Sequence, residues 1–380
     1  MIRISSSFDG GNIHCETCTN SSDIRLQIKA DSAADFSQWF YFRLTGAKDL
    51  PCVMKITNAD KASYVKGWEG YQAVASYDRE NWFRVETVYE NGHLVIRHTP
   101  DVNAVYYAYF APYSMERHSD LIADAGQSPD VSLSVLGETL DGQDMDLLTI
   151  GEPAPGKKAF WLIARQHPGE TMAEWWMEGF LSRLLDEDDA ASRALLEKTC
   201  FYVVPNMNPD GSRRGHLRTN SVGANLNREW SEPDMKRSPE VFLVRQKMIS
   251  TGVDFCLDVH GDEGLPYNFI AGTQGIPSWT AEKDRLLTDF KRLWQQVNPD
   301  FQTTHGYPVA AKGKGNLAMC GNYVAEKFGC LAMTLEMPFK DTADTPNALW
   351  GWSPERSKKF GASLIDVLQQ MDDRLFLPYK

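Results

Sequence analysis

The chain has 380 residues, of which 42% are hydrophobic and 24% are charged. This length is enough for two domains with their own cores, and the ordinary composition excludes a disordered scaffold, a fibrous repeat and a small disulfide-stapled module. The net charge is −12, from 39 basic and 51 acidic residues. An excess of acidic residues argues against general binding of nucleic acid or anionic lipid.

The cysteines and the N-terminus indicate the compartment. Seven cysteines are spaced irregularly, and no second Cys pair matches the one formed by Cys15 and Cys18. We therefore expect reduced thiols. The first residues lack the apolar core of a signal peptide, and no segment approaches the ~20 apolar residues of a membrane span. The expected location is the cytoplasm, without membrane association, and the sequence says nothing about oligomeric state.

Residues 1–115 are rich in aromatic and β-branched side chains, with frequent turn signals between them. Asn91-Gly92 is a strong hairpin signal. Short strands separated by such turns are typical of an all-β sandwich domain. The predicted strands are 39–44, 53–57, 82–85, 94–97 and 105–110.

The pattern changes in residues 116–380, where strands alternate with helices. A hairpin is predicted over 131–150, and Ser353 is a plausible N-cap for a closing helix. The alternation predicts an α/β domain with a mixed sheet, packed closely against the first domain because no linker separates them. The further predicted strands are 159–164, 201–204, 255–259 and 331–335, and the predicted helices are 170–185 and 354–371.

Three predicted strand ends carry side chains that could bind a metal or move a proton. His167 and Glu170 follow one strand in the motif His-Pro-Gly-Glu, His260 ends a second and Glu336 ends a third. Sites in open α/β sheets form at the carboxyl ends of strands, and imidazole with carboxylate is a zinc-binding combination. A carboxylate among apolar residues, as at Glu336, suits a general base with a raised pKa. Each motif alone also fits a turn histidine, a satisfied strand-end histidine or a capping glutamate.

A basic segment lies between these motifs. Residues 206–230 hold four arginines but only two acidic residues. Because arginine binds carboxylates in a bidentate manner, the segment is either an anion-binding surface or a solvated basic loop. The arginines are Arg213, Arg214, Arg218 and Arg228.

Taken together, these motifs resemble the zinc carboxypeptidase family, the funnel-type metallocarboxypeptidases. The order His-x-x-Glu, Asn-Arg, strand-end His and late Glu is more specific than any one motif. The residues within the motifs are similar to those of the cytosolic carboxypeptidase subgroup. The motifs are His-Pro-Gly-Glu, Asn-Pro-Asp-Gly, Gly-Ala-Asn-Leu-Asn-Arg, Asp-Val-His-Gly and Thr-Leu-Glu-Met. Residues 38–42 and 109–113 resemble corners of that subgroup's β-sandwich, so the likeness covers nearly the whole chain.

The resemblance implies one zinc ion per chain, bound by His167, Glu170 and His260. It implies that Glu336 activates the attacking water and later protonates the leaving amine. Two neutral imidazoles and one carboxylate would leave a net positive charge at the metal, which suits a developing oxyanion.

The resemblance also assigns substrate contacts. Arg218 would stabilise the oxyanion, and Asn227 with Arg228 would bind the terminal carboxylate of the substrate. A cationic clamp explains exopeptidase action, because an internal residue carries no such charge. One departure is Gly169, where pancreatic-type members carry an arginine, so one of their substrate contacts is absent here.

The resemblance defines the residues of the specificity pocket less closely than the metal ligands. The active-site tyrosine of the family corresponds to Tyr307 or Tyr323, and the residues do not decide between them. Residues 305–316 contain Lys312 and Lys314 and no acidic residue. If this stretch lines the pocket, as the resemblance implies, its lysines favour a C-terminal Glu or Asp. The alternative is a glycine-rich loop with solvated lysines.

The sequence thus predicts a zinc-dependent metallocarboxypeptidase that acts on the C-termini of peptides or proteins. One alternative is a zinc-dependent N-acyl amino acid deacylase on the same fold, against which the β-sandwich and the Asn227-Arg228 pair argue. The other is a non-catalytic module that binds C-terminal peptides, against which the intact ligand set and Glu336 argue.

Overall fold

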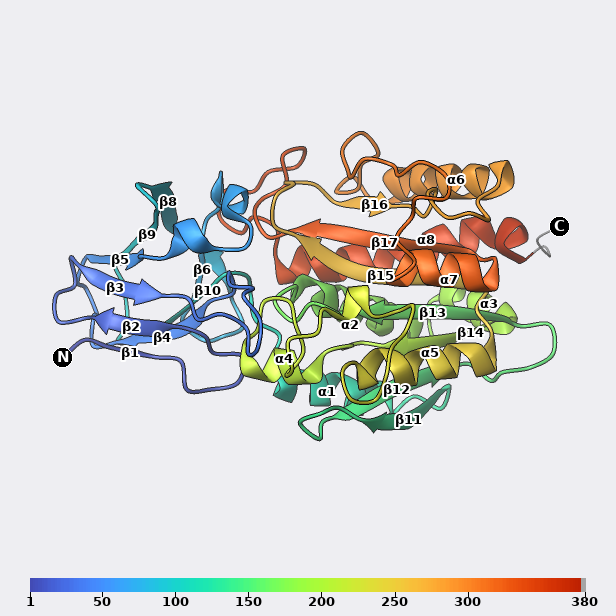
Figure 1. The fold of residues 1–380 in the computed structure, drawn as a ribbon, viewed down its shortest axis with the longest axis horizontal. Coiled ribbons are helices and arrows are strands. Elements are labelled where there is room, and N and C mark those ends of the chain that lie inside the picture. The colour runs from blue at the N-terminus through green and yellow to red at the C-terminus, as the bar shows by residue number, and fades with distance from the viewer. Residues whose placement is uncertain (377–380) are drawn as a thin grey trace.

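The N-terminal part of the chain forms two five-stranded sheets in the computed structural model, which describes residues 1–376. The first sheet contains β1 (Arg3–Ser5), β4 (Tyr41–Thr45), β10 (Ala104–Ala108), β6 (Val74–Ser76) and β7 (Phe83–Arg84), in that order. The second contains β2 (His14–Thr17), β3 (Ile24–Gln27), β5 (Cys52–Ile56), β9 (His93–His98) and β8 (Glu86–Glu90). The predicted N-terminal all-β domain is confirmed, and Figure 1 shows it beside the α/β part.

The second part is built on a seven-stranded sheet. Its order is β11 (Val131–Glu138), β12 (Asp144–Ile150), β14 (Thr199–Val204), β13 (Lys158–Ala164), β15 (Phe255–Asp262), β17 (Leu331–Pro338) and β16 (Phe269–Ala271). The four strands β14, β13, β15 and β17 are parallel, whereas β11, β12 and β16 pair antiparallel at the edges. The predicted mixed sheet of an α/β domain is therefore confirmed.

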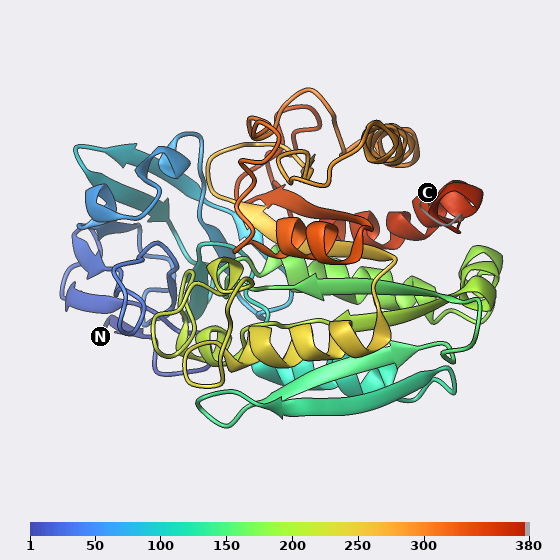
Figure 2. The same cartoon turned by 45° about the vertical axis from the view of Figure 1, so that its right-hand side comes forward.

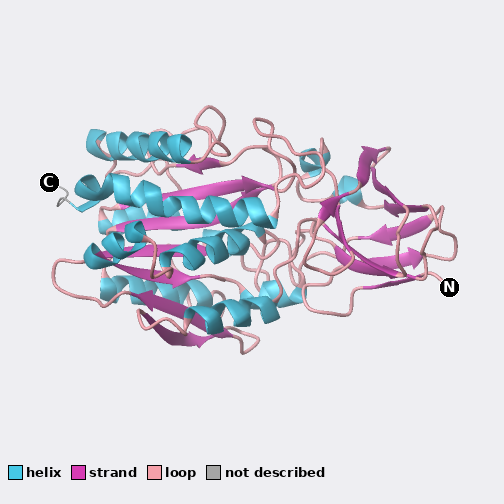
Figure 3. Ribbon diagram, turned by 180° about the vertical axis from the view of Figure 1, so that it is seen from behind, coloured by secondary structure: helices cyan, strands magenta, loops and turns pink. Residues whose placement is uncertain are grey.

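Helices cover both faces of this sheet, which is why its central strands are apolar along their whole length. In Figure 1, α5 (Pro239–Thr251) and α7 (Cys320–Phe328) lie in front of the sheet. Figure 3 shows α2 (Met172–Leu184) and α8 (Pro354–Phe376) on the opposite face. The remaining helical segments are α1 (Met115–Ala125), α3 (Ala190–Lys198), α4 (Pro209–Arg214) and α6 (Ala281–Val297), with short 3₁₀ turns η1 (Ala59–Lys61), η2 (Val65–Trp68) and η3 (Leu226–Arg228).

The clearest predicted elements agree with the structure apart from their ends. The helix predicted from residue 170 begins at Met172, because residues before it form the turn that follows β13. Ser353 caps α8 as predicted, since its Oγ accepts a hydrogen bond of 3.4 Å from the backbone N–H of Arg356. All seven cysteines are free. No helix among the described residues has both the length and the apolar composition needed to cross a membrane.

The two parts pack closely, as predicted. The buried guanidinium of Arg84, on β7, donates to the backbone carbonyls of Phe339 at 2.9 Å and Trp352 at 3.0 Å in the α/β part. The ring of Tyr109 stacks on that of Phe339 with centroids 4.4 Å apart. The strands β15 and β17 end toward this interface, as Figures 1 and 2 show. The sheet edge that carries His260 and Glu336 therefore faces the β-sandwich.

Candidate active site

Three side chains converge at the ends of β13 and β15. His167 Nδ1 lies 2.7 Å from one carboxylate oxygen of Glu170, and His260 Nδ1 lies 2.7 Å from the other. The two ring nitrogens are 3.2 Å apart. All three residues are buried, and they form the one group of possible metal ligands found in the part of the chain that the structure describes. The structure thus brings together the three predicted ligands.

The outer nitrogens of both rings are held by oxygen atoms. His167 Nε2 lies 3.0 Å from Asn225 Oδ1, and His260 Nε2 lies 3.0 Å from Asp258 Oδ2. Because both oxygens are acceptors, a proton on each Nε2 would leave the lone pair of each Nδ1 free to bind a metal ion. Two such lone pairs and a carboxylate that face one common point fit a zinc ion. The donor set of this structure therefore suits the metal that the sequence predicts.

Burial and neighbouring charges set the protonation of these ligands. Burial, followed by the positive charge of Arg218, lowers the pKa of His167 to about 4, so its ring is neutral and able to bind a metal. Burial works in the same direction at His260, but the carboxylates of Asp258 and Glu170 outweigh it and raise its pKa. The Glu170 carboxylate is stabilised in turn by both rings, which lower its pKa despite burial.

Glu336 lies beside this group, on the neighbouring parallel strand. It is paired with His260 in the register of β15 and β17, and only 8% of its surface is exposed. Burial is the main reason that the pKa of its carboxyl group is raised, with the Glu170 carboxylate adding to the effect. Glu336 and the predicted ligands His167 and Glu170 line one cavity of about 720 Å³.

Arg218 reaches the same cavity from the loop after α4. Its guanidinium lies over the rings of Phe36 and Tyr64, with centroid distances of 5.7 and 5.6 Å. Both aromatic residues belong to the β-sandwich domain, and Tyr64 also lines the cavity. The β-sandwich therefore helps to orient a predicted catalytic residue, a role that the sequence does not reveal.

A second residue of the β-sandwich holds the backbone next to Arg218. The buried carboxylate of Asp31 accepts hydrogen bonds from the backbone N–H groups of Leu217 at 2.6 Å, Arg218 at 2.8 Å and Thr219 at 2.8 Å. Hydrogen bonds to a charged acceptor are about twice as strong as neutral ones. Asp31 thus fixes the turn from which the Arg218 side chain extends.

Asn227 and Arg228 belong to the turn η3, which also borders the cavity. Asn227 Oδ1 accepts a hydrogen bond of 2.9 Å from the backbone N–H of Cys320, which orients the amide toward the metal ligands. The exposed side chain of Arg228 donates to the Asn227 carbonyl at 2.6 Å. Both residues line the cavity that also contains Glu336. The structure therefore places the predicted carboxylate-binding pair beside the metal ligands.

The two candidate tyrosines occupy different surroundings. Tyr307 lines the cavity, and its hydroxyl donates a hydrogen bond of 2.5 Å to Asp262 Oδ2. The ring of Tyr323 is tilted against that of Trp230, with centroids 6.2 Å apart, and Tyr323 is not among the residues that line the cavity. Geometry therefore favours Tyr307 as the active-site tyrosine.

Lys312 and Lys314 do not line this cavity. The ammonium group of Lys312 donates instead to the backbone carbonyl of Trp279 at 2.8 Å, and both lysines lie in an exposed loop. The loop carries Tyr307 into the site but directs the lysines elsewhere. The geometry thus favours the alternative weighed for this stretch, a loop with solvated lysines.

Glu263 is one of the cavity residues that were not predicted from the sequence. Glu263 is buried next to Asp262, and burial followed by the Glu170 carboxylate raises the pKa of Glu263 to about 8. Its position three residues after His260 is a signal that the sequence offers, since this segment leaves the strand end directly into the cavity. The contributions of Asp31, Phe36 and Tyr64 have no comparable signal, because they come from the other domain.

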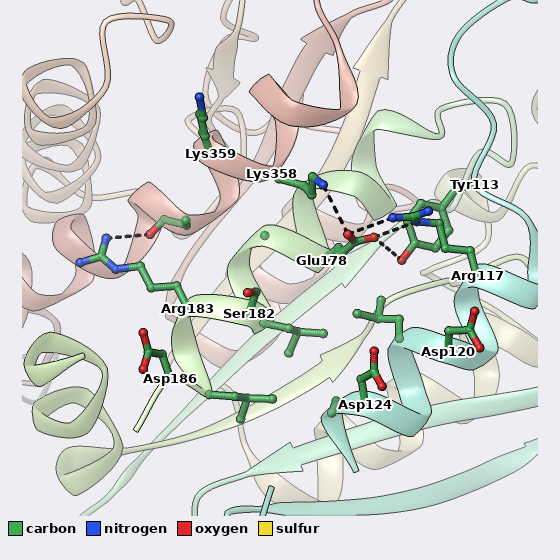
Figure 4. A pocket seen from close by; sticks show the side chains of 16 residues that line it. Tyr113, Arg117, Asp120, Asp124, Glu178, Ser182, Arg183, Asp186, Lys358 and Lys359 are labelled. Carbon is green, nitrogen blue, oxygen red and sulfur yellow. Dashed lines mark hydrogen bonds and ion pairs between the residues drawn. The ribbon is translucent and has the colours of Figure 1, made fainter. Parts of the chain in front are cut away.

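A separate cavity of about 780 Å³ lies between α1, α2 and α8. Figure 4 shows that Glu178 on its wall is held by Arg117, Tyr113 and Lys358. It contains none of the candidate metal ligands. We therefore assign the candidate active site to the cavity at the strand ends.

Comparisons with known proteins agree with this assignment. The family model for the cytosolic carboxypeptidase N-terminal domain matches residues 4–110, and the model for zinc carboxypeptidases matches residues 119–343. An uncharacterized protein of Zymomonas mobilis is 52% identical, over 98% of this chain and 97% of the relative.

Two solved structures are similar over their whole length. One, from Shewanella denitrificans, is described as a candidate carboxypeptidase A and is 53% identical, with a TM-score of 0.97 over 98% of this chain and 99% of the other. A metallo-carboxypeptidase from Pseudomonas aeruginosa in complex with (2-guanidinoethylmercapto)succinic acid is 44% identical, with a TM-score of 0.96 over 98% of this chain and 100% of the other.

Proposed function

Since this chain belongs to the zinc carboxypeptidase family and is a hydrolase that acts on peptides, we propose that it uses one zinc ion to remove the C-terminal residue of peptides or proteins. The observation that carries this proposal is the convergence of His167, Glu170 and His260 beside the buried carboxyl group of Glu336. A cavity that also contains arginine side chains suits a substrate that ends in a carboxylate.

The chemistry divides between the metal and the chain. Zinc supplies a Lewis acid that polarises the scissile carbonyl and makes a water molecule more acidic at neutral pH. Glu336 accepts a proton from the attacking water as the water oxygen bonds to the carbonyl carbon. When the C–N bond breaks, Glu336 passes this proton to the leaving amine. Its burial keeps the pKa high enough for both transfers.

The surrounding side chains bind and orient the substrate. Arg218 stabilises the charge that develops on the carbonyl oxygen, because a positioned cation in a water-poor site acts most strongly on a transition-state charge. Asn227 and Arg228 bind the terminal carboxylate and so exclude internal residues. Tyr307 closes the cavity next to Glu336 and donates to the substrate once it releases Asp262.

We also propose a preference for acidic C-terminal residues. The cations that support it are Lys66, Arg218 and Arg228, all of which line the cavity, rather than Lys312 and Lys314. Together with a divalent metal ion they outweigh the carboxylates there. The Pseudomonas aeruginosa relative binds a ligand whose name combines a succinic acid with a guanidino group; this ligand fits a site that binds carboxylates, and the peptide comparison below decides which side chain is preferred.

The test compares peptides that differ only in the last residue. We expect kcat/KM to be at least about tenfold higher for C-terminal Glu and Asp than for Leu or Lys, because a hydrogen bond to a charged group contributes about 1.5–3 kcal/mol. Equal rates for all four would contradict the acidic preference but leave carboxypeptidase action standing. N-acyl amino acids are assayed in parallel, and their faster hydrolysis would favour the deacylase alternative.

We place this activity in the cytoplasm. The matched N-terminal domain model bears the cytosolic name, and seven free cysteines suit a reducing compartment. Fractionation of the producing cells tests this location, and recovery of the activity outside the cytosolic fraction would contradict it.

A further inference from the structure

A groove on the β-sandwich domain continues from the catalytic cavity. It has a volume of about 660 Å³ and lies between residues 65–72 and strand β8. Val65 and Lys66 line both the groove and the catalytic cavity. The two spaces therefore meet at these residues of η2, so a chain that leaves the catalytic cavity past them enters the groove.

The groove runs along the edge of a sheet. β8 is the last strand of its sheet, paired only with β9 in the strand order, and Figure 1 shows it at the margin of the β-sandwich. Thr87, Val88 and Tyr89 all line the groove. Since successive side chains of a strand point to opposite faces, three consecutive residues can share one groove only if it follows the strand's edge.

An edge strand offers unpaired backbone N–H and C=O groups, and an extended peptide can bind there by adding a strand. On the side away from β8, the groove is bounded by the segment from Trp68 to Gln72. A hydrogen bond of 2.6 Å from Lys340 to the Glu69 carbonyl fixes the position of this segment. Both walls are thus held in place before any peptide binds, which lowers the entropic cost of binding.

We propose that this groove binds the residues of the substrate that precede the scissile bond, in an extended conformation along β8. The inference rests on the proposed carboxypeptidase function. Once the C-terminal residue is held at Asn227 and Arg228, the remaining chain must leave the cavity, and the shared wall at Lys66 leads directly into the groove. The exposed ammonium group of Lys66 favours an acidic side chain at this junction.

The first experiment measures the effect of substrate length. Acetylated dipeptides and acetylated octapeptides share the same last two residues, chosen as those that the enzyme cleaves fastest. We expect kcat/KM to be at least tenfold higher for the octapeptide, mainly through a lower KM. Val88→Trp fills the groove and should remove this advantage. Val102→Trp is the matched control, because Val102 is an exposed valine of the same domain, at 44% against 37% for Val88, and lies outside the groove.

A second variant does not depend on how well the first one folds. Lys66→Glu should reverse the preference between octapeptides that carry Glu or Lys upstream of the scissile bond, and this ratio is independent of the amount of active enzyme. Two results would overturn only the proposal that the groove binds substrate. One is an equal kcat/KM for dipeptide and octapeptide in the unaltered enzyme, and the other is a length advantage that persists in Val88→Trp. Failure to cleave either peptide would overturn the proposed function, and the groove with it.

Discussion

The two walls of the active site are supported in different ways. The proposed metal ligands His167 and His260 are oriented by side chains of the α/β domain itself, through Asn225 and Asp258. Arg218 is oriented by the β-sandwich, through the carboxylate of Asp31 and two aromatic rings. The same cavity thus has one wall built within a domain and one that depends on contact between domains.

This difference separates two kinds of function. In the proposed mechanism, the metal is bound at strand ends of one sheet, whereas the orientation of Arg218 requires that the two domains pack correctly. Gly67 marks how tight this packing is, since a Cβ atom added to it would lie 2.8 Å from the backbone oxygen of Glu263. Variants on the first wall should therefore change metal content, and variants on the second should change turnover while metal content is unaltered.

The largest effect on turnover is expected at Glu336, the proposed proton-transfer residue. Glu336→Gln keeps the shape of the side chain but removes its ability to accept a proton, so kcat should fall by about 10²–10⁴-fold. Zinc content measured on the same sample should be unchanged. Near-full activity in this variant would show that another group transfers the proton.

The wall within the α/β domain is tested at Asp258. This carboxylate orients His260 and also accepts a hydrogen bond of 2.7 Å from Gln166. Asp258→Ala should weaken zinc binding by about 10–100-fold, as is typical when the partner of a metal-bound histidine is removed. Titration with a competing chelator measures the change. Unaltered affinity would mean that Asp258 does not set the orientation of His260.

The wall between domains is tested at Asp31. Asp31→Ala leaves the backbone N–H groups of residues 217–219 without their acceptor, which costs about 1–3 kcal/mol for each buried donor. We expect kcat/KM to fall about tenfold, with zinc content preserved and part of the loss restored in Asp31→Asn. Asp35→Ala is the control, because Asp35 is an exposed carboxylate of the same loop. Loss of zinc in Asp31→Ala would erase the distinction between the two walls.

The smallest expected effect is the pH dependence of stability to which His118 contributes. Burial opposes a charge on His118, but the carboxylates of Glu174 and Asp146 outweigh it and raise the pKa of His118 from its usual value of 6.5 to about 9. A raised pKa stabilises the fold fully below about pH 6.5, and this stability is lost as the pH rises through about 9. The raised pKa of His118 contributes at most about 3 kcal/mol to the free energy of unfolding.

Urea unfolding between pH 6 and pH 10 measures this dependence. His118→Gln should flatten it, and an equally steep loss in that variant would assign the effect to another group. Glu174 also accepts a hydrogen bond of 2.6 Å from Arg165, two residues before His167. The network therefore supports the metal-binding turn from within the α/β domain.

The sequence predicted the first wall better than the second. The candidate metal ligands and Glu336 lie at strand ends in recognisable motifs, and the alternation of strands and helices predicts where those strand ends lie. Asp31 and Tyr64 are far from these motifs in the chain, and nothing local marks them as neighbours of Arg218. Long-range contacts between domains follow from packing, which no motif encodes.

One loop and one helix also show what could not be, or was not, predicted from the sequence. The prediction placed Tyr307 and the lysines on one stretch, but only the folded loop shows that Tyr307 points into the cavity and Lys312 away from it. The helix α1 was not predicted, although a signal was present. Ser114 accepts a hydrogen bond of 3.1 Å from the backbone N–H of Arg117 as its N-cap, and Leu121 and Ile122 form part of its buried face.

The most direct test of a zinc carboxypeptidase is to measure metal content and cleavage products on one sample. We expect one zinc ion per chain and products shortened from the C-terminus only, with activity lost on chelation and restored by zinc. The variant His167→Ala should contain no zinc and release no C-terminal residue. Undiminished hydrolysis after removal of the metal, or cleavage at internal bonds of peptides with amidated C-termini, would contradict the account.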